Sequence, residues 1–227
     1  MTAKVSNQQL SCYIGSAGYH NDLEAARLAW SVPTVLETAG ALVFLTYLSL
    51  PVLLAVRPPS GTLARSVLDG ERERTFLLRV LGLDNDAAWS GGIQNARTRH
   101  LVTSMGRYHS RFRGIRPEYL DFIAATIALS PLRVRAQLGS CLPAADRTGY
   151  WRYISQVLSA FGACLETEKS ASLFCDAFTS EHAQRSADGQ ELFLSLDQRH
   201  PRYVRLAIPS LFDASRFVVG SLLEDAA

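Results

Sequence analysis

The sequence contains few cysteines, and their spacing is not that of a cysteine-based site. Four occur among 227 residues, and none forms a CxxC pair or stands at a zinc-ligand spacing from a histidine. The sequence therefore offers no support for a zinc ribbon or a thioredoxin-like redox centre. Cys164 and Cys175 lie in apolar helical patterns, and we predict that both are small core residues.

The motifs of several common enzyme classes are also missing. There is no glycine-rich phosphate loop, no Rossmann fingerprint and no HExxH zinc motif. No GxSxG nucleophile elbow is present, and no two carboxylates are placed as an acid–base couple. Asp84 and Asp86 lie in a turn-forming stretch, where we interpret them as capping residues rather than magnesium ligands. Motifs thus give no support for nucleotide-dependent, serine-hydrolase or metalloprotease chemistry.

An excess of charge of either sign is lacking as well. The 23 basic and 21 acidic residues give a net charge of +2. Charge therefore creates no strong attraction to nucleic acid, and we expect no nucleic-acid partner. The first ten residues, MTAKVSNQQL, have no apolar signal core. Together with the dispersed cysteines, this predicts a reducing, cytoplasmic setting.

No stretch shows the alternating pattern of a β-strand, whereas apolar residues recur at helical spacing along most of the chain. The predicted class is all-α, a single-domain bundle of about eight helices. We expect residues 1–20 to form a flexible N-terminal tail and residues 21–227 to form the domain. A helix break is expected before Pro131, and residues 187–200 are expected to be less regular.

One uncharged stretch has two interpretations. Residues 38–56, TAGALVFLTYLSLPVLLAV, contain no charged side chain, and their length is marginal for a membrane span. Pro51 removes a helix hydrogen bond and is expected to divide the stretch into two pieces. We therefore favour a buried core segment. Peripheral membrane contact is the alternative.

Residues 97–116, RTRHLVTSMGRYHSRFRGIR, predict an amphipathic helix with a histidine on its apolar face. His109 follows Met105 by four residues and precedes Phe112 by three, so the three share one stripe. An imidazole in an apolar stripe needs a partner, because an unpaired buried polar group is costly. A backbone carbonyl, a carboxylate, a water molecule or a metal ion would serve. The simplest interpretation is a core histidine bonded to a carbonyl.

Five segments occur in the same order as in a family of haem proteins. In order along the chain, they are LETAGALVFLTYLSLPVLLAV, SGTLA, ERERTFLLRVLG, MGRYHSRFRGIRPEYLDFIAATIALSPLRV and AADRTGYWRYISQVLSAFG. Together they make residues 36–165 resemble the rubber oxygenase (latex-clearing protein)-like haem family. The resemblance includes its short branch, related to the ER-bound oxygenase of mycophenolic acid biosynthesis.

The resemblance implies globin-like helix packing around a buried haem b. It implies that His109 is the proximal axial ligand of the iron, with Met105 and Phe112 against the macrocycle. Arg107 and Arg111 are candidates to neutralise the haem propionates because they lie close to His109 in sequence. The alternative for both is a solvated surface arginine.

On the distal side of the haem, the resemblance implies Thr75, whose hydroxyl would hydrogen-bond dioxygen or water. The alternative is a threonine that bonds back to its own helix. The family often has an arginine four residues earlier, where this chain has Glu71. Arg74 takes the place of a lysine that covers the iron in some rubber-cleaving members, and we predict a catalytic role for it. These departures argue against a rubber-like substrate.

The resemblance thus implies a haem b-dependent oxygenase that uses dioxygen or peroxide on an apolar small molecule. The short chain favours a tailoring step in a biosynthetic pathway over polymer degradation. One alternative is a haem-binding or gas-sensing protein without turnover. Another is a non-haem interaction protein, in which His109 is only a satisfied core residue.

Overall fold

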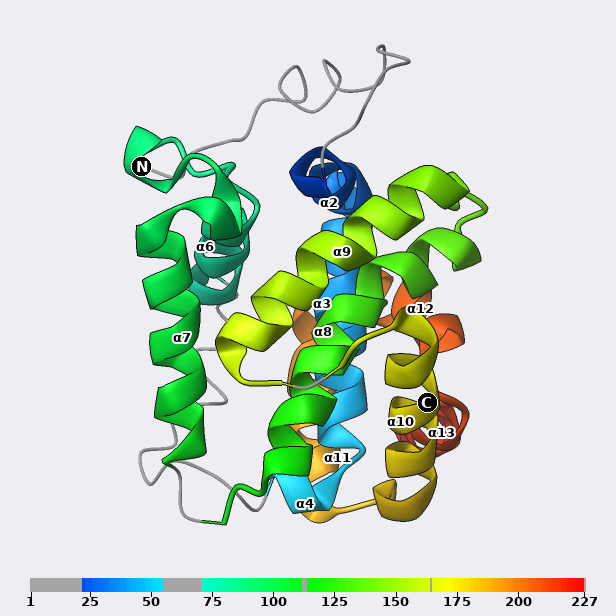
Figure 1. Ribbon diagram of the computed structural model, residues 1–227. Helices are drawn as coiled ribbons and strands as arrows, with labels where there is room; N and C mark the ends of the chain where they lie inside the picture. The colour runs from blue at the N-terminus through cyan, green and yellow to red at the C-terminus, as the bar shows by residue number, and fades with distance from the viewer. Residues whose placement is uncertain (1–21, 55–70, 112–113, 164, 227) are drawn as a thin grey trace.

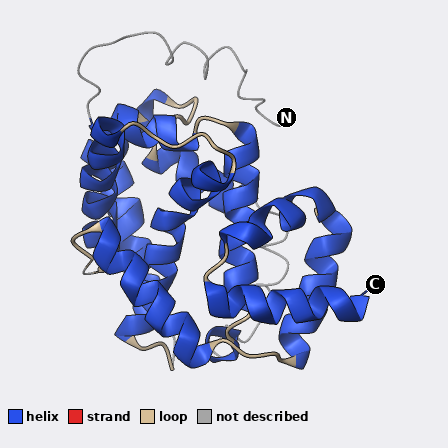
Figure 2. Cartoon of the chain, turned by 90° about the vertical axis from the view of Figure 1, so that its right-hand side faces the viewer, coloured by secondary structure: helices blue, strands red, loops and turns tan. Residues whose placement is uncertain are grey.

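The protein is described by a computed structural model that covers residues 22–54, 71–111, 114–163 and 165–226. All regular secondary structure in these ranges is helical, which confirms the all-α class (Figure 2). Eleven α-helices and three short 3-10 helices are present there, more than the eight helices expected, because several segments are short. The tail expected at residues 1–20 lies outside the described residues.

The helices form a bundle in which α8 runs through the middle (Figure 1). α3 packs along one side of α8, α10 along another, and α9 crosses both α2 and α7. The α-helices are α2 (Asp22–Trp30), α3 (Pro33–Leu48), α4 (Pro51–Leu54), α6 (Glu71–Val80), α7 (Ala96–Ser110), α8 (Pro117–Gln137), α9 (Ala144–Phe161), α10 (Glu168–His182), α11 (Ala187–Arg199), α12 (Pro201–Ala207) and α13 (Asp213–Ala226). The 3-10 helices are η1 (Ala87–Trp89), η2 (Gly92–Gln94) and η3 (Ile208–Ser210).

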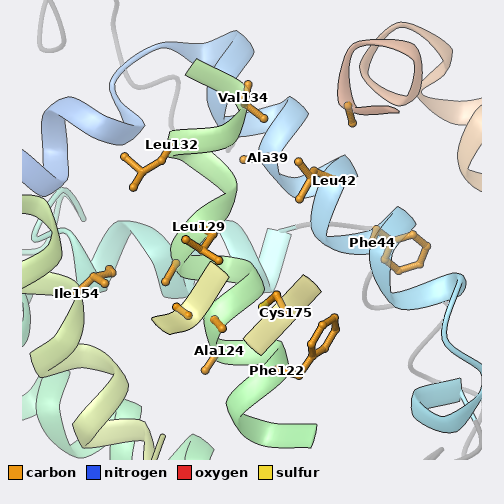
Figure 3. Close-up of a cluster of buried hydrophobic side chains, with 14 of the residues drawn as sticks. Ala39, Leu42, Phe44, Phe122, Ala124, Leu129, Leu132, Val134, Ile154 and Cys175 are labelled. Carbon is orange, nitrogen blue, oxygen red and sulfur yellow. The ribbon is translucent and has the colours of Figure 1, made fainter. Parts of the chain in front are cut away.

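In the hydrophobic core, α8 packs against α3 on one side and α10 on another (Figure 3). Leu42 of α3 is fully buried, and Phe122 of α8 stacks on Phe178 of α10 with ring centroids 4.4 Å apart. Cys175 is also fully buried, beside Thr126, with its Sγ 3.9 Å from the threonine hydroxyl. Its prediction as a small core residue is therefore confirmed, whereas Cys164 lies outside the described residues.

The uncharged stretch is folded into the core as far as it is described. α3 ends at Leu48 and α4 begins at Pro51, as the proline predicted. Between them, the buried Ser49 hydroxyl bonds to the Thr46 carbonyl and to the Ser215 hydroxyl of α13, at 2.7 and 2.9 Å. Of the described helices, none meets the length and hydropathy expected of a membrane span by itself; α2 and α3 do so only as a pair bent by 82°.

Two sequence predictions are wrong: the helix break before Pro131 and the irregular structure of residues 187–200. α8 continues through Pro131, because the carbonyl of Ile127 that the proline leaves unpaired accepts a hydrogen bond from the Ser130 hydroxyl at 2.8 Å. Residues 187–200 are also regular, and all but the last of them belong to α11. α11 begins there because the Ser186 side chain caps it, accepting a hydrogen bond from the Gly189 N–H at 3.0 Å.

Arginine side chains connect the ends of several helices through backbone carbonyls. Arg135 of α8, only 7% exposed, donates to two carbonyls in the last turn of α2 at 2.7 and 3.0 Å. Arg133 donates to the carbonyls of Ser210 and Leu211, at 2.7 and 3.0 Å. Arg27 of α2 donates to two carbonyls just beyond α6, at 2.8 and 2.9 Å. Each guanidinium donates to carbonyls at or just beyond the end of a helix, where the donors of the helix itself run out.

Candidate functional site around His109

His109 lies in the last turn of α7, at one side of the molecule (Figure 1). α7 begins after Asn95, whose side chain accepts a hydrogen bond from the Arg97 N–H at 2.8 Å and caps the helix. The helix then packs against α9, with α6 beside it. Only Thr98, Val102 and Gly106 are buried along α7, so its remaining side chains are partly or fully exposed.

A hydrogen bond within α7 determines which nitrogen of the His109 ring carries the proton. Nδ1 lies 2.9 Å from the carbonyl oxygen of Met105, one turn earlier. A carbonyl can only accept, so Nδ1 carries the proton, and in the neutral ring the lone pair resides on Nε2. The imidazole is half-buried, and its centroid lies 5.8 Å from that of Phe161 at the end of α9. The carbonyl partner was one of the four that the sequence allowed.

The other residues predicted around His109 lie nearer to solvent than the apolar stripe suggested. Met105 is half-buried and contributes its carbonyl to the His109 bond. Arg107 and Arg111 are exposed, before and after the histidine on the same stretch of chain. Phe112 lies outside the described residues. Met105, Arg107 and Arg111 are therefore near His109, and their roles toward a haem stay predictions.

Thr75 and Arg74 lie on α6, the helix beside α7. The Thr75 side chain is exposed, and Arg74 precedes it at a position whose side chain is not described. The end of α6 is held against α9, because the Tyr153 hydroxyl donates to the Val80 carbonyl. The distal roles of Thr75 and Arg74 stay predictions.

Tyr153 of α9 is a residue whose importance was not predicted from the sequence. Besides donating to Val80, its hydroxyl accepts a hydrogen bond from the Ile93 N–H at 2.8 Å. It thereby fastens both the end of α6 and η2, the turn that leads into α7. Burial raises the pKa of Tyr153 to about 12, because the phenolate would lose its hydration. No local pattern distinguishes this tyrosine from other core aromatic residues.

Gly106 was also missed, although the sequence contains a signal for it. Glycine inside a helix costs about 1 kcal/mol relative to alanine, so its presence there often marks a close approach of another backbone. Here the other backbone is that of α9. A Cβ on Gly106 would overlap the carbonyl oxygen of Phe161 and lie 2.7 Å from its carbonyl carbon.

Two shallow hollows lie along α7, and His109 lines neither. One measures about 540 Å³ and the other about 430 Å³. The first is lined by Trp89, Ala96, Arg97, His100, Leu101 and Ser104. Within the described ranges, no group of three or more His, Cys, Asp or Glu side chains is placed to hold a metal ion. A single histidine suits haem iron, because the macrocycle supplies the four other nitrogens.

Comparison with known proteins identifies no relative. No family model matches the chain, and no curated protein or solved structure matches it either. No residue role is therefore carried over to this chain from a matched protein.

Proposed function

We propose that the protein binds haem b through His109 and uses it to oxygenate an apolar small molecule. The observation that carries this proposal is the 2.9 Å hydrogen bond from His109 Nδ1 to the Met105 carbonyl. With the proton on Nδ1, Nε2 would be the nitrogen that binds iron, and a histidine that binds a metal commonly donates its other nitrogen to such an acceptor. The oxygenase chemistry is supported by the ordered resemblance of residues 36–165 to the rubber oxygenase-like family.

The surroundings of His109 support a role as a haem ligand. The half-buried imidazole has an aromatic neighbour in Phe161, and exposed Arg107 and Arg111 lie close along the chain. The Met105 carbonyl fixes the tautomer and restrains the ring. Both arginines would place positive charge beside the propionates. Bound haem would supply the activation of dioxygen or peroxide, and the protein would provide the ligand and control access.

Visible absorbance spectroscopy tests directly whether the protein binds haem. Purified protein, supplied with haem if necessary, should show a Soret band that the His109→Ala variant loses or retains only weakly. His100→Ala is the matched control, because His100 lies on the same helix but is exposed and lines the hollow beside Trp89. Absence of a Soret band from the wild-type protein would refute the proposal. Unchanged haem occupancy in His109→Ala would refute the ligand assignment.

Product analysis separates an oxygenase from a haem-binding or gas-sensing protein. Haem-loaded protein should convert apolar alkenes, with label incorporated from ¹⁸O₂ or labelled peroxide and detected by mass spectrometry. Thr75→Ala should keep the Soret band and change the rate of conversion, whereas Thr75→Ser should retain the wild-type rate. Reversible gas binding without any product would support the sensing alternative instead.

A further inference from the structure

Phe161 contacts α7 twice, once through its backbone and once through its side chain. Its carbonyl faces Gly106, and no Cβ fits between the two backbones. Its ring lies near the His109 imidazole, with centroids 5.8 Å apart and planes inclined by 47°. Gly106 and His109 are three residues apart and therefore lie on the same side of α7. The spacing of the helices at Gly106 thus determines where the Phe161 ring meets the imidazole.

The imidazole is consequently restrained on two sides. The Met105 carbonyl holds Nδ1 from within α7, and the Phe161 ring lies beside the imidazole from α9. Tyr108 is also close, with its ring centroid 5.7 Å from that of His109. Tyr108 is 58% exposed and belongs to α7 itself, so its contact with His109 does not depend on how another helix packs.

We propose that Phe161 is a positioning residue that fixes the rotation of the His109 ring, and that Gly106 makes this contact possible. In a haem complex this would hold the orientation of the imidazole that binds the iron, a role that rests on the proposed function. The ring contact itself exists without a cofactor. It can therefore be tested in the protein as purified as well as after haem is added.

The test compares two sets of variants by ¹⁵N NMR of labelled histidine. In Phe161→Leu, exchange of the His109 Nδ1 proton with water should be about two- to tenfold faster, as expected for loss of one aromatic contact. Phe161→Tyr keeps the ring and should restore the wild-type rate. Phe174→Leu, at a half-buried aromatic residue of α10, should have no effect. Equal exchange rates in Phe161→Leu and wild type would overturn the proposal.

The second set of variants tests the spacing of α7 and α9. Gly106→Ala should accelerate the same exchange, because the new Cβ forces α7 and α9 apart. Gly220→Ala, inside α13 with open space around its Cβ, should leave exchange unchanged. Unchanged exchange in Gly106→Ala would overturn the role given to the glycine.

With haem added, Phe161→Leu should shift the electron paramagnetic resonance g-values of the ferric protein, while Phe161→Tyr should not. If wild-type protein binds no haem, the proposed function fails, and the NMR rates still decide the ring contact. If haem binds but neither g-values nor exchange change in Phe161→Leu, the proposed function stands and the positioning role is refuted.

Discussion

α8 and α7 bury very different fractions of their side chains. Twelve of the 21 residues of α8 are buried, compared with three of the 15 residues of α7. α8 lies among α3, α9 and α10, and its position follows from the apolar surface that these helices remove from water. α7 has far less such surface. Its position depends on a few specific contacts, chiefly Gly106 against Phe161 and Tyr153 near η2.

This difference separates the stability of the fold from the geometry of the candidate site. A core formed by many apolar contacts resists unfolding but does not specify the angle of one ring at its edge. A hydrogen bond and a single helix contact can specify that angle while adding little to the total stability. Changes in α8 should therefore affect unfolding, and changes around α7 should affect His109.

The largest effect is expected from a cavity beside α8. Phe122→Ala should lower the free energy of unfolding by about 3–5 kcal/mol, because it removes a buried ring stacked on Phe178. The His109 Nδ1 proton should exchange at the wild-type rate in the protein that remains folded. Denaturant unfolding measures the change in stability, and NMR measures the exchange of the His109 proton.

Phe217→Ala, at an 81% exposed position, is the control and should change the free energy of unfolding by less than about 0.5 kcal/mol. Faster His109 exchange in Phe122→Ala would show that the two regions are coupled.

A smaller effect is expected where α9 holds the start of α7. Tyr153→Phe should lower the free energy of unfolding by about 1–3 kcal/mol, because the Ile93 N–H loses its buried acceptor and the Val80 carbonyl loses its donor. Hydrogen exchange of the Ile93 amide should increase more than that of core amides in α8. Equal increases in both places would contradict the local role of this tyrosine.

The same variant should change the stability at alkaline pH. An unfolded tyrosine loses its proton near the ordinary value of 10.0, whereas burial raises the pKa of Tyr153 to about 12. Between these pH values the folded state holds the extra proton, so stability falls as pH rises. Tyr153→Phe should make this decline shallower. Tyr150, whose pKa burial also raises, keeps contributing in both proteins. If stability fell equally steeply with pH in wild type and Tyr153→Phe, the assignment of this decline to Tyr153 would be refuted.

The smallest effect concerns reactivity rather than stability. Burial raises the pKa of the Cys175 thiol to about 12, while Cys141 is exposed. In native protein, iodoacetamide should modify Cys141 and leave Cys175 intact, whereas denatured protein should be modified at both. Peptide mass spectrometry measures the two sites. Equal native rates would show that the α8–α10 core opens more readily than its burial indicates.

The sequence predicted the helices where local signals were unambiguous. The break at Pro51 is present, with α3 ending at Leu48 and α4 beginning at the proline. The continuation through Pro131 was missed, because it depends on the orientation of the Ser130 hydroxyl. Proline alone favours a break, and the compensating hydrogen bond is a property of one rotamer.

The candidate site was predictable only in part. Helical periodicity identified His109 as a polar residue in an apolar stripe and included a carbonyl among its possible partners. The contact of Gly106 and His109 with Phe161 was not predictable, since Phe161 lies more than 50 residues later in the chain and meets them only through the docking of α7 on α9. Sequence spacing determines neighbours along a helix, but not which helix packs against it.

The two arginines of α8 also have a consequence for protein synthesis. Two of the carbonyls that Arg135 binds belong to α2 and leave the ribosome before it, and the third, of Ser140, follows after only five residues. The carbonyls that Arg133 binds are 77 and 78 residues further along the chain. Phe212, on which the Arg133 guanidinium stacks at 4.2 Å, is made equally late. Until residues 210–212 have been synthesised, Arg133 lacks these acceptors and the ring on which it stacks. The packing of α8 against this later segment therefore cannot form as early as its contact with α2.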